Sequence, residues 1–221
     1  FTEIRDALSL LPDRETATVF SGGGTPSLKP PVEMESILAE LQKEHSFAED
    51  VEITLEINPE SIDQEKARGL REAGVNRASM GVQSLYREDL QLLGRLHEPE
   101  SAAQCYADLR AAGFDNISLD FIYGRPSQKL AEWEKELKEI RRWSPEHLSL
   151  YELILEPATA MTRAVRAGTL VLPEEEERLE MYRLARTLLR EGGWEWYETS
   201  NYCRPGREAR HNLENWQGAE Y

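Results

Sequence analysis

The sequence predicts an α/β fold in which helices cover a parallel sheet, arranged as a partial barrel of six strand–helix units. Short apolar or β-branched runs alternate with longer stretches of helical period along the whole chain, and this alternation is typical of a parallel sheet or barrel. A complete eight-unit barrel takes about 250 residues. The 221 residues of this chain therefore favour an open, partial (β/α)6-type TIM barrel. No linker-like segment divides the chain, so we expect a single domain over residues 1–221.

The expected strands are short runs that stop at glycine, proline or polar residues. Three glycines at 22–24 end the first strand, and Asn58-Pro59 ends the second, because both are turn signals. We expect strands at 18–21, 51–57, 78–82, 117–123, 148–155 and 194–199. Parallel strands of a barrel end on one face, so the residues that follow them are candidates for a shared site.

The stretches between these strands have helical period. Ser61 or Asp63 caps one helix and Gly74 ends it, following the usual capping preferences. Pro173 and the acidic run at 174–177 begin the last helix, where the helix dipole favours negative charge. We expect helices over about 31–41, 64–73, 86–94, 100–112, 130–140 and 174–191, and a long connection without clear period over 156–173.

Composition narrows the class of protein. The chain has 26 basic and 41 acidic residues and a net charge of −15, which is unfavourable for a nucleic-acid backbone or an anionic membrane as the main partner. Residues 1–11 are charged and amphipathic, and no long apolar run occurs, so we expect a cytoplasmic protein. Its two cysteines, Cys105 and Cys203, are too far apart in sequence to form a closely spaced metal or cluster motif.

Polar or glycine residues stand where the expected strands end. The glycines at 22–24 let the backbone approach a ligand closely, although a plain tight turn explains them equally well. An acidic Asp120 inside an apolar strand needs a protein or ligand partner, because an unpaired buried carboxylate is costly. The candidate ligand-binding residues are Gly23, Gly24, Thr25, Glu56, Gln83, Arg95 and Asp120.

Five strings, in this order along the chain, carry a resemblance to a known family. They are FSGGGTPS at 20–27, EINPE at 56–60, GVQS at 81–84, DFIYGRP at 120–126 and YETSNY at 197–202. They resemble the radical S-adenosylmethionine (SAM) proteins of the oxygen-independent coproporphyrinogen III oxidase group. The resemblance runs from about residue 18 to residue 221 and implies the radical SAM barrel core with its first strand missing.

Within that group, the region from Tyr197 onward is most similar to the heme-chaperone (HemW) branch, whose members carry an HNxxYW string. His211, Asn212 and Trp216 match this string, whereas Asn215 stands where the family has Tyr. The resemblance implies that His211, Asn212 and Trp216 are candidates for heme binding. A surface or capping role for His211 remains the alternative from the residues alone.

The resemblance also implies the cofactors. Gly23, Gly24 and Thr25 would hold the amino-acid end of SAM through backbone groups, and Glu56 would bind its amino group or ribose. Gln83, Arg95 and Asp120 would line the remainder of one or two such ligands. Glu, Arg, Gln and a glycine backbone complement the ammonium, carboxylate and hydroxyl groups of SAM.

This chain departs from the family in its cysteines. The family holds a 4Fe-4S cluster with three thiolates in a CxxxCxxC loop, and neither Cys105 nor Cys203 can form that loop. We therefore expect the cluster cysteines to lie before Phe1 and a C-terminal domain to follow Tyr221, with a degenerate homologue as the alternative. No metal ligand is expected within the chain itself.

Three functions remain open at this point. The first is a HemW-like heme-binding chaperone that delivers heme to an acceptor protein, whose identity is unknown. The second is an oxygen-independent coproporphyrinogen III dehydrogenase, which converts its porphyrinogen to protoporphyrinogen IX by radical oxidative decarboxylation. The third is an α/β barrel whose glycine loop binds phosphate, because a fold alone does not determine function.

Overall fold

The computed structural model describes residues 15–218, so the amphipathic segment at 1–11 lies outside the described residues. These residues fall into two compact units. The first unit holds 15–80, 101–117 and 209–218, and the second holds 81–100 and 118–208. The expectation of a single domain over residues 1–221 stays a prediction.

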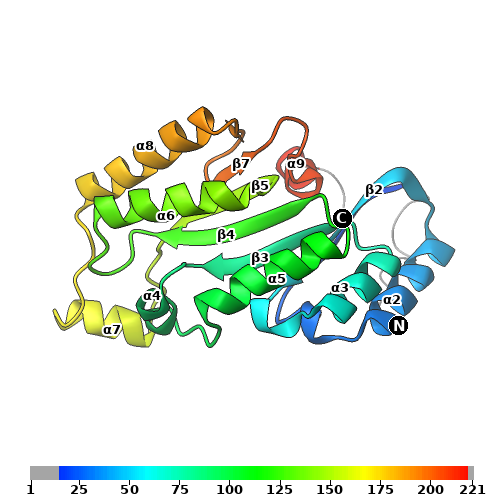
Figure 1. The fold of residues 1–221 in the computed structure, drawn as a ribbon, viewed down its shortest axis with the longest axis horizontal. Coiled ribbons are helices and arrows are strands. Elements are labelled where there is room, and N and C mark those ends of the chain that lie inside the picture. The colour runs from blue at the N-terminus through cyan, green and yellow to red at the C-terminus, as the bar shows by residue number, and fades with distance from the viewer. Residues whose placement is uncertain (1–14, 219–221) are drawn as a thin grey trace. The chain divides into compact units, whose positions relative to one another are not determined.

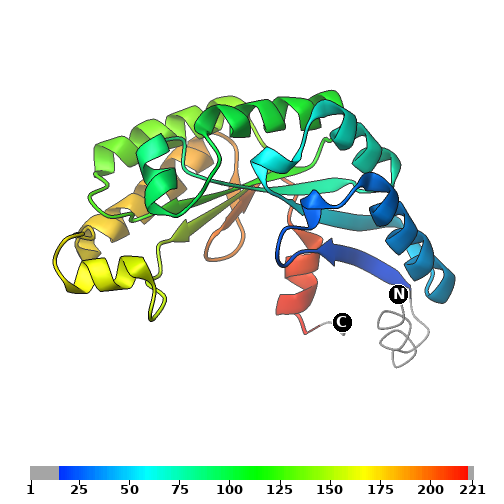
Figure 2. The ribbon, with the colours of Figure 1, turned by 90° about the horizontal axis from the view of Figure 1, so that it is seen from below.

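The first unit is built on parallel strands. Strand β1 pairs with β2, with Val19 opposite Ile53, and β2 pairs with the start of β3, with Thr54 opposite Arg77. Figure 2 shows helix α9 in red beside β1 in blue. The elements are β1 (Thr16–Ser21), η1 (Pro26–Leu28), α2 (Pro31–Glu44), β2 (Phe47–Ile57), η2 (Pro59–Ser61), α3 (Gln64–Glu72), the first part of β3 (Arg77–Gln83), most of α5 (Pro99–Ala111) and α9 (Arg210–Trp216).

Helices α2 and α3 form because their apolar residues recur on one face. Met34 and Leu38 of α2 are buried, as are Ala67 and Leu70 of α3, at the three- and four-residue spacing of an amphipathic helix. The side chain of Asp63 accepts a hydrogen bond of 2.8 Å from the backbone N–H of Lys66. Asp63, one of the two predicted caps, is therefore the one that caps α3.

The second unit joins a parallel pair of strands to a short antiparallel hairpin. Strand β4 runs parallel to β5, whereas β7 is antiparallel to both β5 and β6. Helices α6 and α8 lie side by side along this sheet (Figure 1). The elements are the end of β3, α4 (Arg87–Leu92), β4 (Ile117–Tyr123), α6 (Leu130–Trp143), β5 (His147–Glu152), α7 (Ala160–Arg166), α8 (Glu175–Glu191), β6 (Glu195–Trp196) and β7 (Asn201–Cys203).

The core of the second unit is centred on Trp133 of α6. Its side chain has no exposed surface, and its ring stacks on Tyr123 with centroids 5.6 Å apart. The indole N–H donates to the carbonyl of Met181, 3.1 Å away. This hydrogen bond satisfies the polar atom that burial would otherwise leave without a partner, and it ties α6 to α8.

The expected sixth strand is wrong in length and direction. Only Glu195–Trp196 of the range 194–199 is strand, and it pairs antiparallel to Asn201–Cys203. The backbone N–H of Tyr197 donates to the carbonyl of Asn201, so the chain turns back at once. A parallel partner would have required a crossover connection of about a dozen or more residues, and only residues 197–200 lie between these strands.

Two further expectations need correction. Strand β5 ends at Glu152, three residues earlier than expected. The stretch at 156–173 contains helix α7, which the lack of period concealed. Thr159 caps this helix by accepting from the backbone N–H of Thr162, a signal that could have been read from the sequence. Among the described residues, no helix has the length and apolarity needed to cross a membrane.

Candidate functional site

The glycine loop follows β1 and lies against the end of β2. Gly23 and Gly24 have φ of 78° and 65°, in the left-handed region that disfavours other residues. The backbone N–H of Gly23 donates to Oε2 of Glu56 over 3.0 Å. The structure thus brings together two of the predicted SAM-binding elements within the first unit. They present a backbone loop and a carboxylate that could receive an ammonium group.

Gly22 is required in this loop by close approach. A Cβ at that position would lie 2.5 Å from Cε1 of Phe20 and 2.9 Å from the carboxyl carbon of Glu56. No other residue fits there without displacing one of these side chains. Around a Cβ at Gly23 or Gly24, by contrast, no described atom lies within 4 Å, so those two positions face open space.

Beyond the loop, Ser27 connects the ends of β1 and β2. Its buried hydroxyl accepts from the backbone N–H of Asn58 over 3.1 Å and from the Ser61 hydroxyl over 2.6 Å. Thr25 begins the intervening turn as the residue before η1. These hydrogen bonds fix the position of the glycine loop relative to Glu56. A preformed ligand site needs its binding groups to be held in place in this way.

His211 lies on α9 against the exposed side of β1. Its ring stacks on Phe20, with centroids 5.0 Å apart and an angle of 14° between the planes. Its Nδ1 lies 3.1 Å from the hydroxyl of Thr18, which donates to Glu214 over 3.0 Å. A threonine hydroxyl has one proton. Because Thr18 gives that proton to Glu214, it accepts from Nδ1–H of His211, so Nε2 carries the free lone pair.

Nε2 is the nitrogen that a metal would bind, and no described residue forms a hydrogen bond with it. Histidine ligands generally donate their other N–H to a neighbour, which fixes the tautomer and the ring orientation. Thr18 and Glu214 provide such a support for His211. The sequence reading missed both of them, as well as Phe20. The two-residue spacing of Thr18 and Phe20 was a usable signal, because it puts them on one face of a strand.

Glu52 fixes the start of α9. This residue of β2 is 6% exposed, and its carboxylate accepts from the backbone N–H groups of Arg210 and His211, each at 3.2 Å. The residue at the helix start, Ala209, has no capping side chain. Glu52 therefore satisfies helix N–H groups that would otherwise lack partners, and its charge suits the helix dipole.

The other two heme-binding candidates, Asn212 and Trp216, do not share the surroundings of His211. Asn212 is the next residue of α9 and is half-buried, whereas Trp216 is 73% exposed. At 3.6 residues per turn, Trp216 lies about 140° around the helix from His211. The structure therefore does not bring the indole to the face that carries His211, and roles for Asn212 and Trp216 stay predictions.

Gln83 ends β3 in the second unit with a strained backbone. Its φ is 67°, a left-handed value that costs energy for a residue with a side chain. The guanidinium of the fully buried Arg125 donates to the Gln83 carbonyl over 3.4 Å. Glu136, also fully buried, accepts from the backbone N–H of Leu85 over 2.8 Å and pairs with Arg125 at 2.6 Å. This buried network holds the backbone around Gln83 in place.

Arg95 follows α4 and is exposed. Among the described residues, its side chain makes no ion pair or hydrogen bond. The loop that carries it is anchored by His97, which is 4% exposed and has its Nε2 3.1 Å from the carbonyl of Val82. The Arg95 guanidinium is therefore available to an anionic group.

Asp120 lies half-buried in β4 at the end of a hydrogen-bonded chain of side chains. The Ser118 hydroxyl donates to Oδ1 of Asp120 over 3.3 Å and lies 2.8 Å from Nδ1 of His147. Nε2 of His147 lies 2.7 Å from the hydroxyl of Tyr197. The expectation that Asp120 needs a partner is confirmed, and Ser118 is one. Within this chain of hydrogen bonds, His147 contacts Ser118 and Tyr197 contacts His147, and the sequence reading assigned neither of them to the site.

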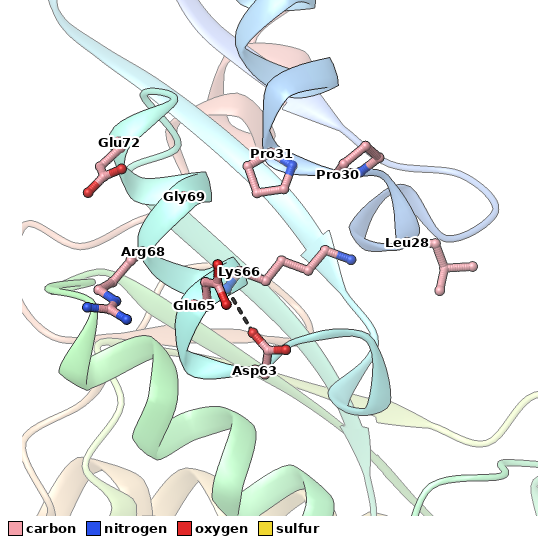
Figure 3. Close-up of a pocket in the computed structure, with 9 residues that line it drawn as sticks. All are labelled: Leu28, Pro30, Pro31, Asp63, Glu65, Lys66, Arg68, Gly69 and Glu72. Atoms are coloured by element: carbon pink, nitrogen blue, oxygen red, sulfur yellow. Dashed lines mark hydrogen bonds between the residues drawn. The ribbon is translucent and has the colours of Figure 1, made fainter.

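Figure 3 shows a separate surface pocket of the first unit, with a volume of about 580 Å³. Gly69 and Pro31 meet at its base, where a Cβ on Gly69 would lie 2.8 Å from Cγ of Pro31. Its other lining residues are Leu28, Pro30, Asp63, Glu65, Lys66, Arg68 and Glu72. None of the predicted site residues lines this pocket, and its lining carries charges of both signs. We assign it no ligand.

The cysteines do not fit a 4Fe-4S cluster. Burial raises the pKa of both the Cys105 and the Cys203 thiols to about 12, so both stay protonated near neutral pH, whereas cluster ligation requires thiolates. Among residues 15–218, no group of three or more His, Cys, Asp or Glu side chains is arranged to hold a metal. The described part of the chain therefore supplies no cluster ligands.

Comparison with known proteins defines the class. The fold matches the coproporphyrinogen III oxidase HemN of Escherichia coli, a radical SAM enzyme, with a TM-score of 0.80, 26% identity and coverage of 98% of this chain and 49% of that one. A family model described as the Radical SAM superfamily matches residues 1–140. The chain belongs to the Radical SAM superfamily, and its α/β fold is the partial barrel of that family.

Its relatives narrow the group. The chain is 39% identical to the mouse "Radical S-adenosyl methionine domain-containing protein 1, mitochondrial" over 220 residues, and 38% identical to the "Heme chaperone HemW" of Synechocystis over 204 residues. These matches cover 100% and 92% of this chain but 50% of each relative. The chain thus spans about half the length of the curated relatives it matches. The resemblance to the coproporphyrinogen oxidase group is confirmed, and the protein is HemW- and HemN-like.

Proposed function

We propose that this protein is a heme-binding chaperone of the radical SAM fold that delivers heme to an acceptor protein. The observation that carries the proposal is the environment of His211. Thr18 and Glu214 hold the ring with Nδ1 protonated, Phe20 covers one face, and Nε2 is left with its lone pair. A neutral imidazole held in this way suits an axial iron ligand.

The match to a relative named heme chaperone supports the same conclusion. The residues of α9 that follow His211 would add contacts to the bound heme. We propose Asn212 and the exposed Trp216 for this role. The acceptor protein would meet the heme from the solvent side. We propose a cytoplasmic location, and we note that one relative carries the word mitochondrial in its name.

SAM is proposed as the second ligand. The residues of the first unit fit its amino-acid end, because Gly23 and Gly24 have open space around them and Glu56 presents a carboxylate beside the loop. Gln83, Arg95 and Asp120 are the residues of the second unit that we propose to bind SAM. The 4Fe-4S cluster typical of the family would supply an electron to SAM, and the residues of this chain would bind and orient SAM.

Heme titration of the intact protein tests the main proposal. Wild-type protein should shift the heme Soret band at stoichiometric ratios, and His211→Ala should abolish or change that shift. His45→Ala is the matched control, since it removes another partly buried histidine of the same unit. A Soret shift that is identical in wild type and His211→Ala would remove His211 from the proposal.

The alternative function is oxidative decarboxylation of coproporphyrinogen III, and the structural match to HemN favours it. An anaerobic assay of the intact, cluster-reconstituted protein for protoporphyrinogen IX distinguishes the two functions. Product formation would establish the enzyme, whereas an intact cluster without product, together with heme binding that depends on His211, would establish the chaperone. The family match leaves a barrel that merely binds phosphate without support.

A further inference from the structure

A second pocket lies in the second unit, far in sequence from the glycine loop. It has a volume of about 570 Å³, within the range of small-molecule sites. Helix α8 forms one wall and the β6–β7 hairpin forms the other; Figure 1 shows α8 beside β7. The residues that matter for its chemistry are Arg183, Arg186, Arg190, Trp196 and Tyr202.

The pocket is basic in a strongly acidic chain. Arg183, Arg186 and Arg190 lie three and four residues apart on one face of α8. Among the described residues, none of the three forms an ion pair or a side-chain hydrogen bond, although the chain has 41 acidic residues against 26 basic ones. Glu195 is the one acidic residue in the lining. The positive charges of this pocket are therefore not neutralised by ion pairs among the described residues of the unit.

The helix dipole does not explain this cluster. A basic residue is stabilised by the dipole only in the last turn of a helix, and α8 ends at Glu191. Arg190 satisfies that condition. Arg183 and Arg186 lie further back along the helix, where they are exposed and the dipole does not account for them.

Arg186 is held in place by aromatic rings. Its guanidinium carbon lies 4.1 Å from the centroid of Trp196 and 5.8 Å from that of Tyr182, which is cation–π geometry. Stacking uses the flat face of the guanidinium and leaves its N–H groups at the edge for other partners. Trp196 is 44% exposed, so ring surface remains open to solvent.

The neighbouring pair of Arg204 and Trp194 is a cation–π contact whose polar groups have partners within the protein. Arg204 stacks on Trp194 at 3.6 Å, but it also donates to the carbonyl of Gly192 and to the hydroxyl of Ser144. Trp194 is 2% exposed and donates to the carbonyl of Pro145. The donors of that pair have partners within the protein, whereas the donors of Arg186 have none among the described residues.

We propose that this pocket binds a flat, conjugated molecule that carries carboxylate or phosphate groups. The guanidinium plane of Arg186 and the ring of Trp196 would receive the planar part, and Arg183 and Arg190 would receive the anionic groups. Burial raises the pKa of Tyr202, so its hydroxyl stays neutral and can donate. A carboxylated tetrapyrrole and a nucleotide share this chemistry. The inference goes beyond the proposed heme site, since His211 lies in the other unit.

Binding of two probes to the intact protein tests the proposal. The probes are metal-free coproporphyrin III, which has no iron for His211 to bind, and ATP. At least one of them should bind, with affinity that falls as salt rises, and Arg186→Gln should weaken it by about tenfold, as expected for the loss of a cation that stacks on the planar part of the ligand. Adenosine and inorganic phosphate, which carry only the ring or only the charge, should bind at least ten times more weakly than ATP.

Arg166→Gln is the matched control, because it removes one exposed arginine from α7 of the same unit. Arg183→Gln is a second variant that leaves the stack on Trp196 intact. Binding that weakens in Arg186→Gln and Arg183→Gln but not in Arg166→Gln supports the site, and the probe that binds identifies the source of the ligand. The proposal is overturned if neither probe binds, or if all three variants bind as wild type does.

Discussion

The hydroxyl of Thr18 lies 3.1 Å from Nδ1 of His211, although 193 residues separate them in the sequence. The same hydroxyl donates to Glu214, so its remaining role toward the imidazole is that of an acceptor. This relationship decides which histidine nitrogen is free. Strand β1 thus acts on the proposed heme ligand through the Thr18 hydroxyl and through the stacked ring of Phe20.

Thr18→Val should therefore weaken heme binding without removing the ligand. Valine keeps the shape of threonine but cannot accept from Nδ1–H, so the imidazole loses its fixed tautomer. Loss of one hydrogen bond of roughly 0.5–1.5 kcal/mol should raise the heme Kd by about two- to tenfold. Soret titration measures the affinity, and electron paramagnetic resonance measures the ligand field. Thr16→Val on the same strand is the control, and an equal change in both variants would speak against the proposed hydrogen bond.

Gly22→Ala should weaken SAM binding more than it lowers stability. Its Cβ would lie 2.9 Å from the carboxyl carbon of Glu56 and would push that carboxylate away from the loop. We expect a loss of affinity of about tenfold, as for one charged hydrogen bond. Equilibrium dialysis with SAM on the intact, reconstituted protein measures it. Gly168→Ala is the control, since Gly168 has a positive φ of 73° and open space around it; unchanged SAM affinity in Gly22→Ala would refute the role of Glu56.

Arg125→Met should strongly destabilise the fold. It leaves Glu136 charged, fully buried and without its 2.6 Å partner, which typically costs about 3–5 kcal/mol. Arg87→Met is the matched control, because the Arg87–Glu98 pair has the same 2.6 Å separation but is solvent-exposed, and such pairs contribute about 1 kcal/mol or less. Urea unfolding measures both variants. Similar losses in the two variants would contradict the importance of burial.

The two cysteines should make the protein less stable at alkaline pH. Burial raises the pKa of each thiol to about 12 in the folded state, against about 8.5 in an unfolded chain. Below the unfolded value both states are protonated and stability is constant. Above it the unfolded state loses its protons first, so the free energy of unfolding falls as the pH rises toward 12. Urea unfolding at pH 8 and at pH 10 measures this free energy. It should fall less between the two pH values in a Cys105→Ala, Cys203→Ala double variant than in wild type. An equal fall would exclude the thiols as its cause.

The chain of residues 1–221 on its own should not cleave SAM reductively. Its two cysteines are buried and protonated, so they do not provide the three thiolates that a 4Fe-4S cluster uses. Anaerobic incubation with dithionite and SAM, followed by chromatography for 5′-deoxyadenosine, measures this. Formation of 5′-deoxyadenosine above the level of a protein-free blank would contradict it.

Local patterns determined much of this protein. The alternation of runs predicted the parallel strands, because periodicity is a property of neighbouring residues. The strings at the strand ends predicted the family, and the glycines at 22–24 predicted the loop that contacts Glu56. The short hairpin of β6 and β7 escaped prediction, since apolar residues alone do not give strand direction.

Only the tertiary structure decided the surroundings of His211, Gln83 and Arg186. Thr18 of β1 and Glu52 of β2 contact α9 from distant parts of the sequence, and Glu214 lies one turn along α9 from His211. No residue pattern in the sequence indicates that β1 and β2 pack against α9. Arg125 holds the strained backbone of Gln83 through a buried network. Such contacts arise when strands and helices pack, because packing and hydrogen-bond geometry depend on three-dimensional positions that local residue patterns do not contain.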